Sequence, residues 1–272
     1  MLRSVAVLTS LVLSFSIVAC GDDDDSGSDG SEPAVASFEF SGTEMTGPSS
    51  VEAGAVQVEF TNSTDDDAGV TLIRVDGDHS AEEARKAGQA WGDGGKPLPE
   101  WITFEGGSGS VHPGESFTAV QELSAGNYLG IDIDSNNFTE FEVTGDGDGE
   151  LPSTDGQIDA VEYRFDSSGL KAGNQQVTFT NKGKEPHFAL AAPIKPGHTI
   201  EEVRKSVKSD SGPSAPIIES KTVSTGILDG GRSQVVDLEL QKWDYALVCF
   251  VGDREGGPPH AFKGMISEAV VE

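Results

Sequence analysis

Cysteine and basic residues are both scarce in this chain. It has two cysteines in 272 residues, and its 18 lysines and arginines are outnumbered by 46 aspartates and glutamates, giving a formal net charge of −28. Nucleic acids and anionic membrane surfaces are bound through basic patches, so this charge argues against both as partners. It favours solubility and attraction to a basic partner.

Long apolar runs are also lacking. The run from Val5 to Ala19 is shorter than the roughly 20 residues that a membrane-spanning helix requires. It follows Arg3 and ends in a small residue, which is the pattern of a secretory signal peptide. We place this signal peptide at residues 1–19, and past it the sequence offers no second candidate for a membrane span.

The end of the signal peptide resembles a lipid-attachment motif. Residues 17–20 (IVAC) are similar to the lipobox of bacterial lipoproteins. This resemblance implies that Cys20 receives a diacylglycerol and palmitate and becomes the new N-terminus, so that the membrane is a partner through the lipid. The alternative is an ordinary signal peptide followed by an incidental cysteine.

Residues 20–35 are predicted to be a tether. Positions 21–35 (GDDDDSGSDGSEPAV) hold six acidic side chains and no basic one, with Gly, Ser and Pro between them. Such a segment cannot bury apolar area and repels itself, so it is expected to stay solvated. The folded part is then expected to be lipid-anchored on the extracytoplasmic side of a cell membrane, in the periplasm or at the cell surface.

The rest of the chain repeats itself. Residues 58–62 (VEFTN) align with 177–181 (VTFTN), and 79–85 align with 198–204, both at an offset of 119 residues. Residues 114–128 align with 231–245 at an offset of 117. Two nearly equal offsets indicate a tandem duplication with one domain per copy. We place the first copy at 36–146 and the second at 156–272, joined by an acidic, glycine-rich linker at 147–155.

Each copy is predicted to be an all-β sandwich. The 34 glycines and the many short runs of Val, Ile, Phe and Thr are typical of this class. A short helix is expected to begin near Ser80 in the first copy and near Thr199 in the second, where acidic residues follow an N-cap. Strands are expected at 38–40, 58–62, 161–165, 177–181, 235–240, 245–251 and from 265 onward.

Cys249 is the one thiol that remains once Cys20 is lipidated. Exported thiols usually end in disulfides, so a lone one needs an explanation. The alternation of Tyr245, Leu247, Cys249 and Val251 places these side chains on one face of a strand. Cys249 is therefore an unreactive core residue, a labile free thiol or a metal ligand.

The second copy resembles the plastocyanin-like cupredoxins. Residues 181–187 (NKGKEPH) look like the loop that delivers the first histidine ligand of these proteins, here His187. Cys249 ends a strand, and residues 259–265 (PHAFKGM) place His260 and Met265 before the last strand, in the order of blue copper ligands. The resemblance implies two tandem Greek-key cupredoxin-like domains and one copper ion held by His187, Cys249, His260 and Met265. A thiolate, two imidazoles and a distant thioether suit copper as it cycles between oxidation states.

The second copy also departs from that family. Ten residues (FVGDREGGPP) separate Cys249 from His260, where the small electron carriers have only a few, although longer spacings occur in copper nitrite reductase-like domains. Each ligand taken singly has an ordinary alternative: Cys249 is a small buried side chain, His187 and His260 are loop residues, and Met265 fills the core. Three histidines lack such a setting: His79, His112 and His198. His79 and His198 stand at the same repeat position, just before the expected helix, and are interpreted as structural.

The first copy lacks the ligands. At the shared offsets, Ala68 stands where His187 does and Asp132 where Cys249 does, and residues 133–141 contain neither His nor Met. We expect this copy to hold no copper and to act as a spacer or docking module. Its acidic and amide residues do not fit a calcium loop and are expected at the surface: Asp132, Asp134, Asn136 and Glu140.

The predicted function is binding of one copper ion for electron transfer or copper handling, with a redox or copper-transfer protein as partner. In electron transfer, an exposed edge of His260 is the expected exit. An enzyme is not expected, because the trinuclear cluster of multicopper oxidases needs about eight histidines, many in H-x-H pairs, and this chain has five histidines and no such pair. The alternative is a metal-free β-sandwich lipoprotein for interaction or adhesion at the cell surface.

Overall fold

The computed structural model describes residues 32–94, 96–147, 149–209 and 216–272. The predicted signal peptide, Cys20 and nearly all of the acidic tether lie outside the described residues, so lipidation and export stay predictions. From Pro33 to Glu272 the chain forms one compact unit. Within the described ranges, no helix is long and apolar enough to cross a membrane.

The first repeat is built from short strands and one helix. In β4 (Gly54–Asn62), alternate side chains such as Val56, Val58 and Phe60 are fully buried, as the two-residue period of a strand facing a core requires. The helix is α1 (Ala81–Gly92). The other strands are β1 (Ala34–Phe40), β2 (Met45–Thr46), β3 (Ser50–Glu52), β5 (Thr71–Val75), β6 (Ile102–Gly107), β7 (Ser116–Leu123), β8 (Gly126–Ile131) and β9 (Phe138–Thr144).

The second repeat has a similar series of elements. Its counterpart of β4 is β12 (Gly173–Asn181), at the offset of 119 seen in the sequence. The helix α2 (Ile200–Ser209) corresponds to α1, and the described part of this repeat also contains the 3-10 helices η2 (Glu219–Lys221) and η3 (His260–Lys263). The other strands are β10 (Gly156–Val161), β11 (Arg164–Ser168), β13 (Leu190–Pro193), β14 (Val223–Ser224), β15 (Ile227–Leu228), β16 (Ser233–Leu240), β17 (Asp244–Val248) and β18 (Ile266–Val270).

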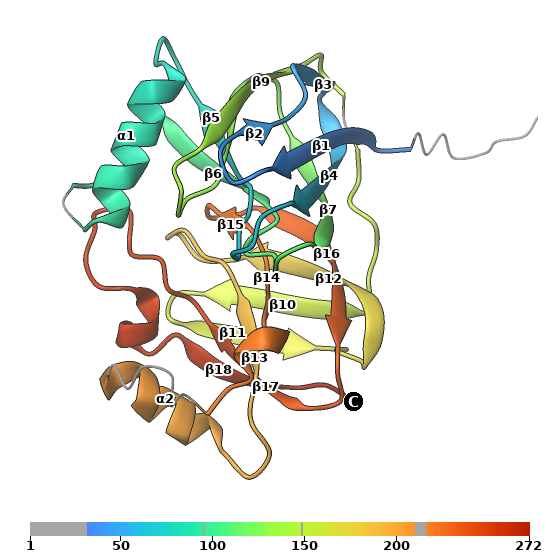
Figure 1. Ribbon diagram of the computed structural model, residues 1–272, viewed down its shortest axis with the longest axis vertical. Helices are drawn as coiled ribbons and strands as arrows, with labels where there is room; N and C mark the ends of the chain where they lie inside the picture. Colours follow the sequence, from blue (N-terminus) through green and yellow to red (C-terminus); the bar gives the residue numbers. More distant parts are fainter. Residues whose placement is uncertain (1–31, 95, 148, 210–215) are drawn as a thin grey trace, which may run out of the picture. The chain divides into compact units, whose positions relative to one another are not determined.

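One sheet crosses from one repeat to the other. Its strand order is β11-β10-β12-β16-β7-β4-β1-β2 (Figure 1). At the junction β7 pairs antiparallel with β16, and Ala119 lies opposite Val236. These two residues are 117 positions apart, which is the offset of the repeat, so they occupy equivalent positions in the two copies. The two repeats therefore pair through the same position of the same strand, as the subunits of a two-fold dimer do.

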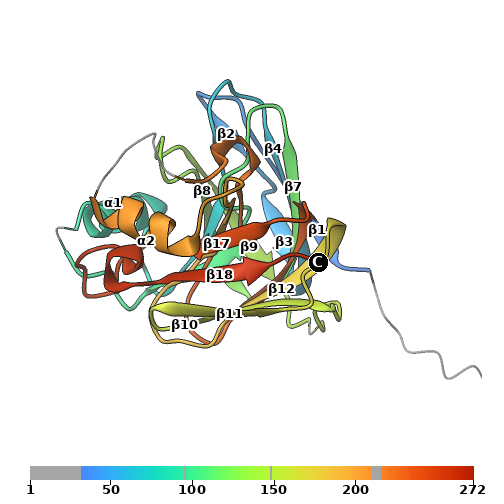
Figure 2. The ribbon, with the colours of Figure 1, turned by 90° about the horizontal axis from the view of Figure 1, so that it is seen from below.

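Two smaller sheets complete the sandwiches. Their orders are β15-β6-β5-β8-β9-β3 and β14-β13-β17-β18. β15 belongs to the second repeat but pairs with β6 of the first, with Leu228 opposite Glu105. Figure 2 shows β17 and β18 lying over β10, β11 and β12, and side chains from both layers, Phe179 and Leu247 among them, form one buried core. A second core fills the first repeat. The predicted β-sandwich fold is thus confirmed; the two-domain boundaries stay a prediction.

Both helices begin where the sequence predicts. Ser80 caps α1 in a capping box with Glu83, whose side chain reaches back to the backbone N–H of Ser80 at 2.9 Å. Thr199 Oγ1 accepts from the backbone N–H of Glu202 at 3.4 Å and so caps α2. In each helix two glutamates lie in the first turn, where they oppose the positive end of the helix dipole.

Two expected strands differ from those observed. The expected strand 161–165 is interrupted by a tight turn at residues 162–163, between β10 and β11, where Tyr163 has a left-handed φ of 63°. The expected strand 245–251 ends at Val248, and Cys249 and Val251 lie beyond it. The face predicted for Tyr245, Leu247 and Cys249 is nevertheless correct, since all three are buried in one cluster.

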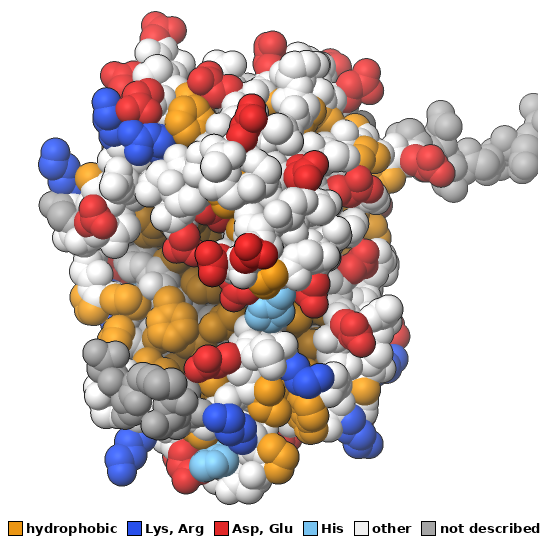
Figure 3. All heavy atoms as spheres, in the orientation of Figure 1, with side chains coloured by type: hydrophobic (Ala, Val, Ile, Leu, Met, Phe, Trp, Pro, Cys, Tyr) orange, Lys and Arg blue, Asp and Glu red, His pale blue; other side chains and the backbone are white. Residues whose placement is uncertain are grey.

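The surface reflects the charge of the chain. Acidic side chains are spread over the face in Figure 3, and apolar side chains gather between the positions of α1 and α2. Phe250 and Phe262 are among the exposed large apolar side chains, at 42% and 48% exposure. Both are close in sequence to Cys249 or His260, so apolar surface lies near the predicted site.

Candidate metal centre

Asn181 fixes the loop that carries His187. This side chain is fully buried at the end of β12. Its Nδ2 donates to the carbonyl oxygens of Glu185 and Leu228, both at 2.8 Å, and its Oδ1 accepts from the N–H of Gly183 at 2.9 Å. His187 then exchanges two backbone hydrogen bonds with Leu228, at 3.0 and 2.8 Å. The position of His187 is therefore set by the loop and by β15 together.

The last segment of the chain brings Cys249, His260 and Met265 together. Ala261 N donates to Cys249 O at 2.7 Å, Met265 N donates to His260 O at 3.0 Å, and Cys249 N approaches Met265 O at 3.4 Å. The short helix η3 begins at His260, and Gly264 turns the chain back with a φ of 106°. These bonds hold a loop that ends in β18, as the sequence order of the ligands predicts.

Three donor atoms converge at this place. Cys249 Sγ lies 3.8 Å from His187 Nδ1 and 3.6 Å from His260 Nδ1, and the two Nδ1 atoms are 3.0 Å apart. All three side chains are fully buried, as is Met265. Among the residues that the structure describes, this is the one group of three or more His, Cys, Asp or Glu side chains that could hold a metal ion. A soft sulfur with two imidazole nitrogens is a donor set that suits copper.

Burial determines how these groups are protonated without a metal. It raises the pKa of the Cys249 thiol to about 12, although the backbone N–H groups of Phe188 and Val251 bond to the sulfur and lower it. Burial, together with the nearby His260, lowers the pKa of His187 to about 4. Burial also lowers the pKa of His260, against the opposing effect of Asp253. At neutral pH both imidazoles are neutral and ready to act as ligands, whereas the thiol still carries a proton.

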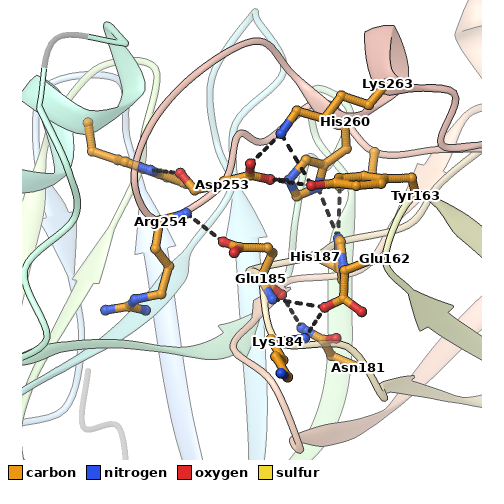
Figure 4. Close-up of polar contacts among 12 residues, drawn as sticks. Glu162, Tyr163, Asn181, Lys184, Glu185, His187, Asp253, Arg254, His260 and Lys263 are labelled. Carbon is orange, nitrogen blue, oxygen red and sulfur yellow. Dashed lines mark hydrogen bonds and ion pairs between the residues drawn. The ribbon is translucent and has the colours of Figure 1, made fainter.

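The Nε2 atom of His260, on the far side of the ring from the Nδ1 that faces Cys249, is bonded to a carboxylate. His260 Nε2 lies 2.9 Å from Asp253 Oδ1, which also accepts from the Tyr163 hydroxyl at 3.0 Å, and the Lys263 ammonium contacts Asp253 Oδ2 (Figure 4). Burial alone would raise the pKa of Asp253, but hydrogen bonds from Lys263, Tyr163 and His260 hold it below its usual range. The expectation that an edge of His260 is exposed is therefore wrong, because the ten-residue insertion folds over this side chain.

Sequence reasoning missed this carboxylate and its partners. Asp253 lies in the insertion between Cys249 and His260, and Tyr163 sits on the turn between β10 and β11. The length of the insertion and its acidic residues were the signals available. They could not show that Asp253 reaches His260, since this depends on how distant segments pack.

The first repeat shows the same frame without the ligands. Ala68 pairs with Val111 as His187 does with Leu228. Asp132, at the place of Cys249, is buried and accepts from the backbone N–H groups of Gly69 at 2.9 Å and Ser135 at 2.8 Å. The expectation that Asp132 lies at the surface is wrong, because it replaces the thiol with a hydrogen-bonded carboxylate. Asp134 and Glu140 are exposed as expected, and Asn136 is partly buried.

The remaining histidines have other partners. His79 stacks on Trp101 with ring centroids 3.9 Å apart. His112 Nδ1 lies 2.8 Å from Asp67 Oδ1, and His198 Nδ1 lies 3.2 Å from a carboxylate oxygen of Glu202. None of the three belongs to the group of donor atoms around Cys249.

Comparison with known proteins finds similarity among solved structures. No protein-family model matches the chain, and no curated protein sequence does. The chain is similar to auracyanin A, a blue copper protein of Chloroflexus aurantiacus, at 17% identity over 42% of this chain and 100% of that one, with a TM-score of 0.31. Auracyanin of Roseiflexus castenholzii is 19% identical over 43% of this chain and 94% of that one, with a TM-score of 0.27. A multicopper oxidase is 14% identical over 89% of this chain and 88% of that one, with a TM-score of 0.22. Similarities this low carry no ligand or activity over to this chain, so what the site holds follows from its own donor atoms.

Proposed function

We propose that this protein binds one copper ion for electron transfer. Its ligands are His187 Nδ1, Cys249 Sγ and His260 Nδ1, with the thioether of Met265 as a weak fourth. The observation that carries the proposal is the convergence of one sulfur and two imidazole nitrogens, all within 4.8 Å of one another and buried. Thiolate and thioether are soft ligands that favour copper over calcium, magnesium or manganese.

When bound, the ion supplies one-electron chemistry between its cupric and cuprous states. The chain contributes a rigid, dry frame around the donor atoms. The backbone N–H groups of Phe188 and Val251 bond to Cys249 Sγ and stabilise the thiolate form. Asp253 bonds to His260 Nε2 and keeps the imidazole turned so that Nδ1 faces the sulfur. A frame that does not rearrange between oxidation states favours rapid electron transfer.

Burial of the ligands favours electron transfer over copper handling. A protein that passes copper on must expose its ligands to the receiving protein. Here His187, Cys249 and His260 are all fully buried, and residues 250–259 cover His260. The short covalent route to the surface leads from Cys249 to Phe250, which is 42% exposed. We expect electrons to leave along this route toward a redox partner rather than through His260.

Copper stoichiometry tests the proposal. Equilibrium dialysis of the full chain against cupric ion should give one tightly bound copper per chain. His187→Ala should abolish this binding, and His79→Ala, which removes a histidine at a distance from the donor atoms, should leave it intact. Equal binding by the two variants would show that His187 is not a ligand and would contradict the proposed site. No binding by the wild type would leave the metal-free interaction or adhesion protein as the better description.

An enzymatic role is not proposed. The residues that the structure describes contain one cluster suited to a metal, and a multinuclear oxidase cluster needs about eight histidines. The chain has five histidines in all. The copper-loaded protein is therefore expected to consume no oxygen in the presence of a reducing substrate, which an oxygen electrode measures.

We further propose that the protein is a lipoprotein anchored through Cys20 to the extracytoplasmic side of a cell membrane. The support is in the sequence: a signal-like segment, residues 17–20 that resemble a lipobox, and an acidic stretch that follows. In a bacterial host the wild type should fractionate with membranes and gain the mass of the lipid. Cys20→Ser should lack the mass of the lipid, and a wild type without this mass would exclude the anchor.

A further inference from the structure

Residues 250–259, the insertion between Cys249 and His260, are held by the first repeat. The indole Nε1 of Trp91, at the end of α1, donates to the carbonyl oxygen of Asp253 at 2.7 Å across 162 residues of sequence. Leu98 N donates to the carbonyl oxygen of Arg254 at 2.6 Å. The repeat without ligands thus bonds to the backbone of the loop that carries the ligand histidine.

Arg254 anchors the same insertion through its side chain. Its Nη2 donates to the carbonyl oxygens of Pro99 at 2.9 Å and Ile102 at 2.8 Å, and its Nη1 donates to Asp229 Oδ1 at 2.7 Å. Asp229 in turn accepts from Phe104 N at 2.7 Å. Hydrogen bonds from a charged group are roughly twice as strong as neutral ones. Two consecutive residues of the insertion are therefore tied to the first repeat.

Apolar packing supports these bonds. Trp91, Ile102 and Phe104 belong to a buried cluster, and Val251 of the insertion packs against it. Phe188, which follows the ligand His187, packs against the same cluster. The rings of Trp91 and Phe104 lie 5.4 Å apart. The first repeat therefore contacts both ligand-bearing segments of the second.

Asp253 connects these contacts to the donor atoms. Its backbone carbonyl is the acceptor for Trp91, and its carboxylate lies 2.9 Å from His260 Nε2. The Tyr163 hydroxyl donates to the same carboxylate oxygen, and the Lys263 ammonium contacts the other one (Figure 4). An imidazole whose Nε2–H is held by a carboxylate presents the lone pair of Nδ1 to a metal. His260 Nδ1 is the atom that faces Cys249.

We propose that the first repeat acts as a clamp on the metal site of the second. Trp91 and Arg254 hold Asp253 in place, and Asp253 fixes the orientation of His260; all three are positioning residues. The inference rests on the copper site proposed above. It gives the repeat without ligands a role, and it explains how ten residues can separate two ligands without leaving His260 free to turn.

The clamp is tested first on the metal-free, full-length chain. Trp91→Phe keeps an aromatic ring and removes the donor to Asp253, and Trp243→Phe makes the same change in the second repeat away from the insertion. Loss of one hydrogen bond that keeps the insertion closed should make Cys249 react with a thiol reagent roughly tenfold faster. Trp243→Phe should react at the wild-type rate. Equal rates in all three proteins would overturn the clamp.

The orientation of His260 is tested by its tautomer, which nitrogen-15 NMR of the metal-free protein reports. The wild type should carry its proton on Nε2. Asp253→Asn keeps an oxygen that can accept from Nε2–H and should preserve this tautomer, whereas Asp253→Leu should give a mixture. A mixture in the wild type, or a single Nε2–H tautomer in Asp253→Leu, would overturn the proposed role of Asp253. Both measurements are made without copper, so a failure to bind copper would count against the proposed function alone.

Discussion

Single residues distinguish the two repeats at the place where a metal can bind. Where the second repeat has His187 and Cys249, the first has Ala68 and Asp132 on the same backbone frame. Asp132 uses its two carboxylate oxygens on neighbouring backbone N–H groups. The frame itself is therefore independent of the metal, and the side chains at a few positions decide which repeat can hold copper.

The buried asparagine of the ligand loop offers a matched pair of variants. Asn181 bonds Glu185 O and Leu228 O, and Asn62 makes the same two bonds in the first repeat, to Asp66 O and Val111 O. Changing either one to Ala removes these two hydrogen bonds and a third, which the amide oxygen accepts from the N–H of Gly183 or of Thr64. Each change should therefore lower the free energy of unfolding by about 2–3 kcal/mol.

Only Asn181→Ala should also weaken copper binding, because only that loop delivers a ligand. Chemical denaturation measures the first effect, and copper titration of each folded variant measures the second. If Asn62→Ala weakened copper binding as much as Asn181→Ala did, the loss would come from general loosening of the fold and not from the ligand loop.

Copper binding should release one proton at neutral pH. Burial raises the pKa of the Cys249 thiol to about 12, so the thiol must lose its proton to become a ligand. The pKa of His187 is lowered to about 4, mainly by burial, and that of His260 is lowered as well. The affinity for cupric ion should therefore rise about tenfold per pH unit between pH 7 and 9. Titrations at several pH values measure this slope, and an affinity independent of pH would rule out a thiolate ligand.

At the scale of elements, the turn after η3 sets the spacing of His260 and Met265. Gly264 ends this short helix with a φ of 106°, and a Cβ there would meet no atom within 4 Å. Gly264→Ala is therefore a test of backbone strain without a clash. It should lower the free energy of unfolding by about 1–2 kcal/mol.

The same substitution at Gly197, before α2, is the matched control. Gly197 has a φ of 84° and equally open surroundings, so the cost in stability should be similar. The visible spectrum of the copper-loaded protein should change in Gly264→Ala and stay as in the wild type in Gly197→Ala. An unchanged spectrum in Gly264→Ala would show that the turn does not control the ligand geometry.

Local patterns in the sequence predicted some elements and missed others. The caps at Ser80 and Thr199 and the burial of Cys249 follow from short-range spacing. The convergence of His187, Cys249 and His260 was implied by the resemblance of their segments to the ligand loops of cupredoxins. Such features depend on residues close in sequence or on a known ligand order, so one sequence was enough to predict them.

Long-range contacts could not be predicted in this way. The carboxylate of Asp253 is held by Tyr163, which is 90 residues away, and its backbone by Trp91, 162 residues away. No periodicity links such positions. The turn at Tyr163 was missed for a related reason: its left-handed backbone lies inside a run of strand-forming residues.

At the scale of the whole chain, the two repeats share a buried ionic contact. Glu105 of β6 is 1% exposed and faces Arg232 of the second repeat and Arg74 of its own. Burial outweighs the two arginines and raises the pKa of Glu105 to about 7, from 4.5. Between pH 4.5 and 7 the folded state therefore binds more protons than the unfolded state, and stability is lost as the pH rises through this window.

Glu105→Gln removes this titration and tests the junction. The variant should gain stability relative to the wild type from pH 5 to pH 8, by up to about 3 kcal/mol. Glu122→Gln, on the exposed side of the neighbouring β7, is the control and should keep a constant difference from the wild type. Thermal or chemical unfolding at both pH values measures the effect. A constant difference for Glu105→Gln as well would mean that the two arginines keep Glu105 ionised throughout.

The proposed site is tested most directly by the visible absorption spectrum of the full chain after cupric ion is added. A copper–thiolate bond should give an intense band near the red end of the visible spectrum. The band should vanish in Cys249→Ser and persist in Asp132→Ser, the equivalent change in the first repeat. A colourless wild type, or a band that survives in Cys249→Ser, would contradict a copper site built on His187, Cys249 and His260.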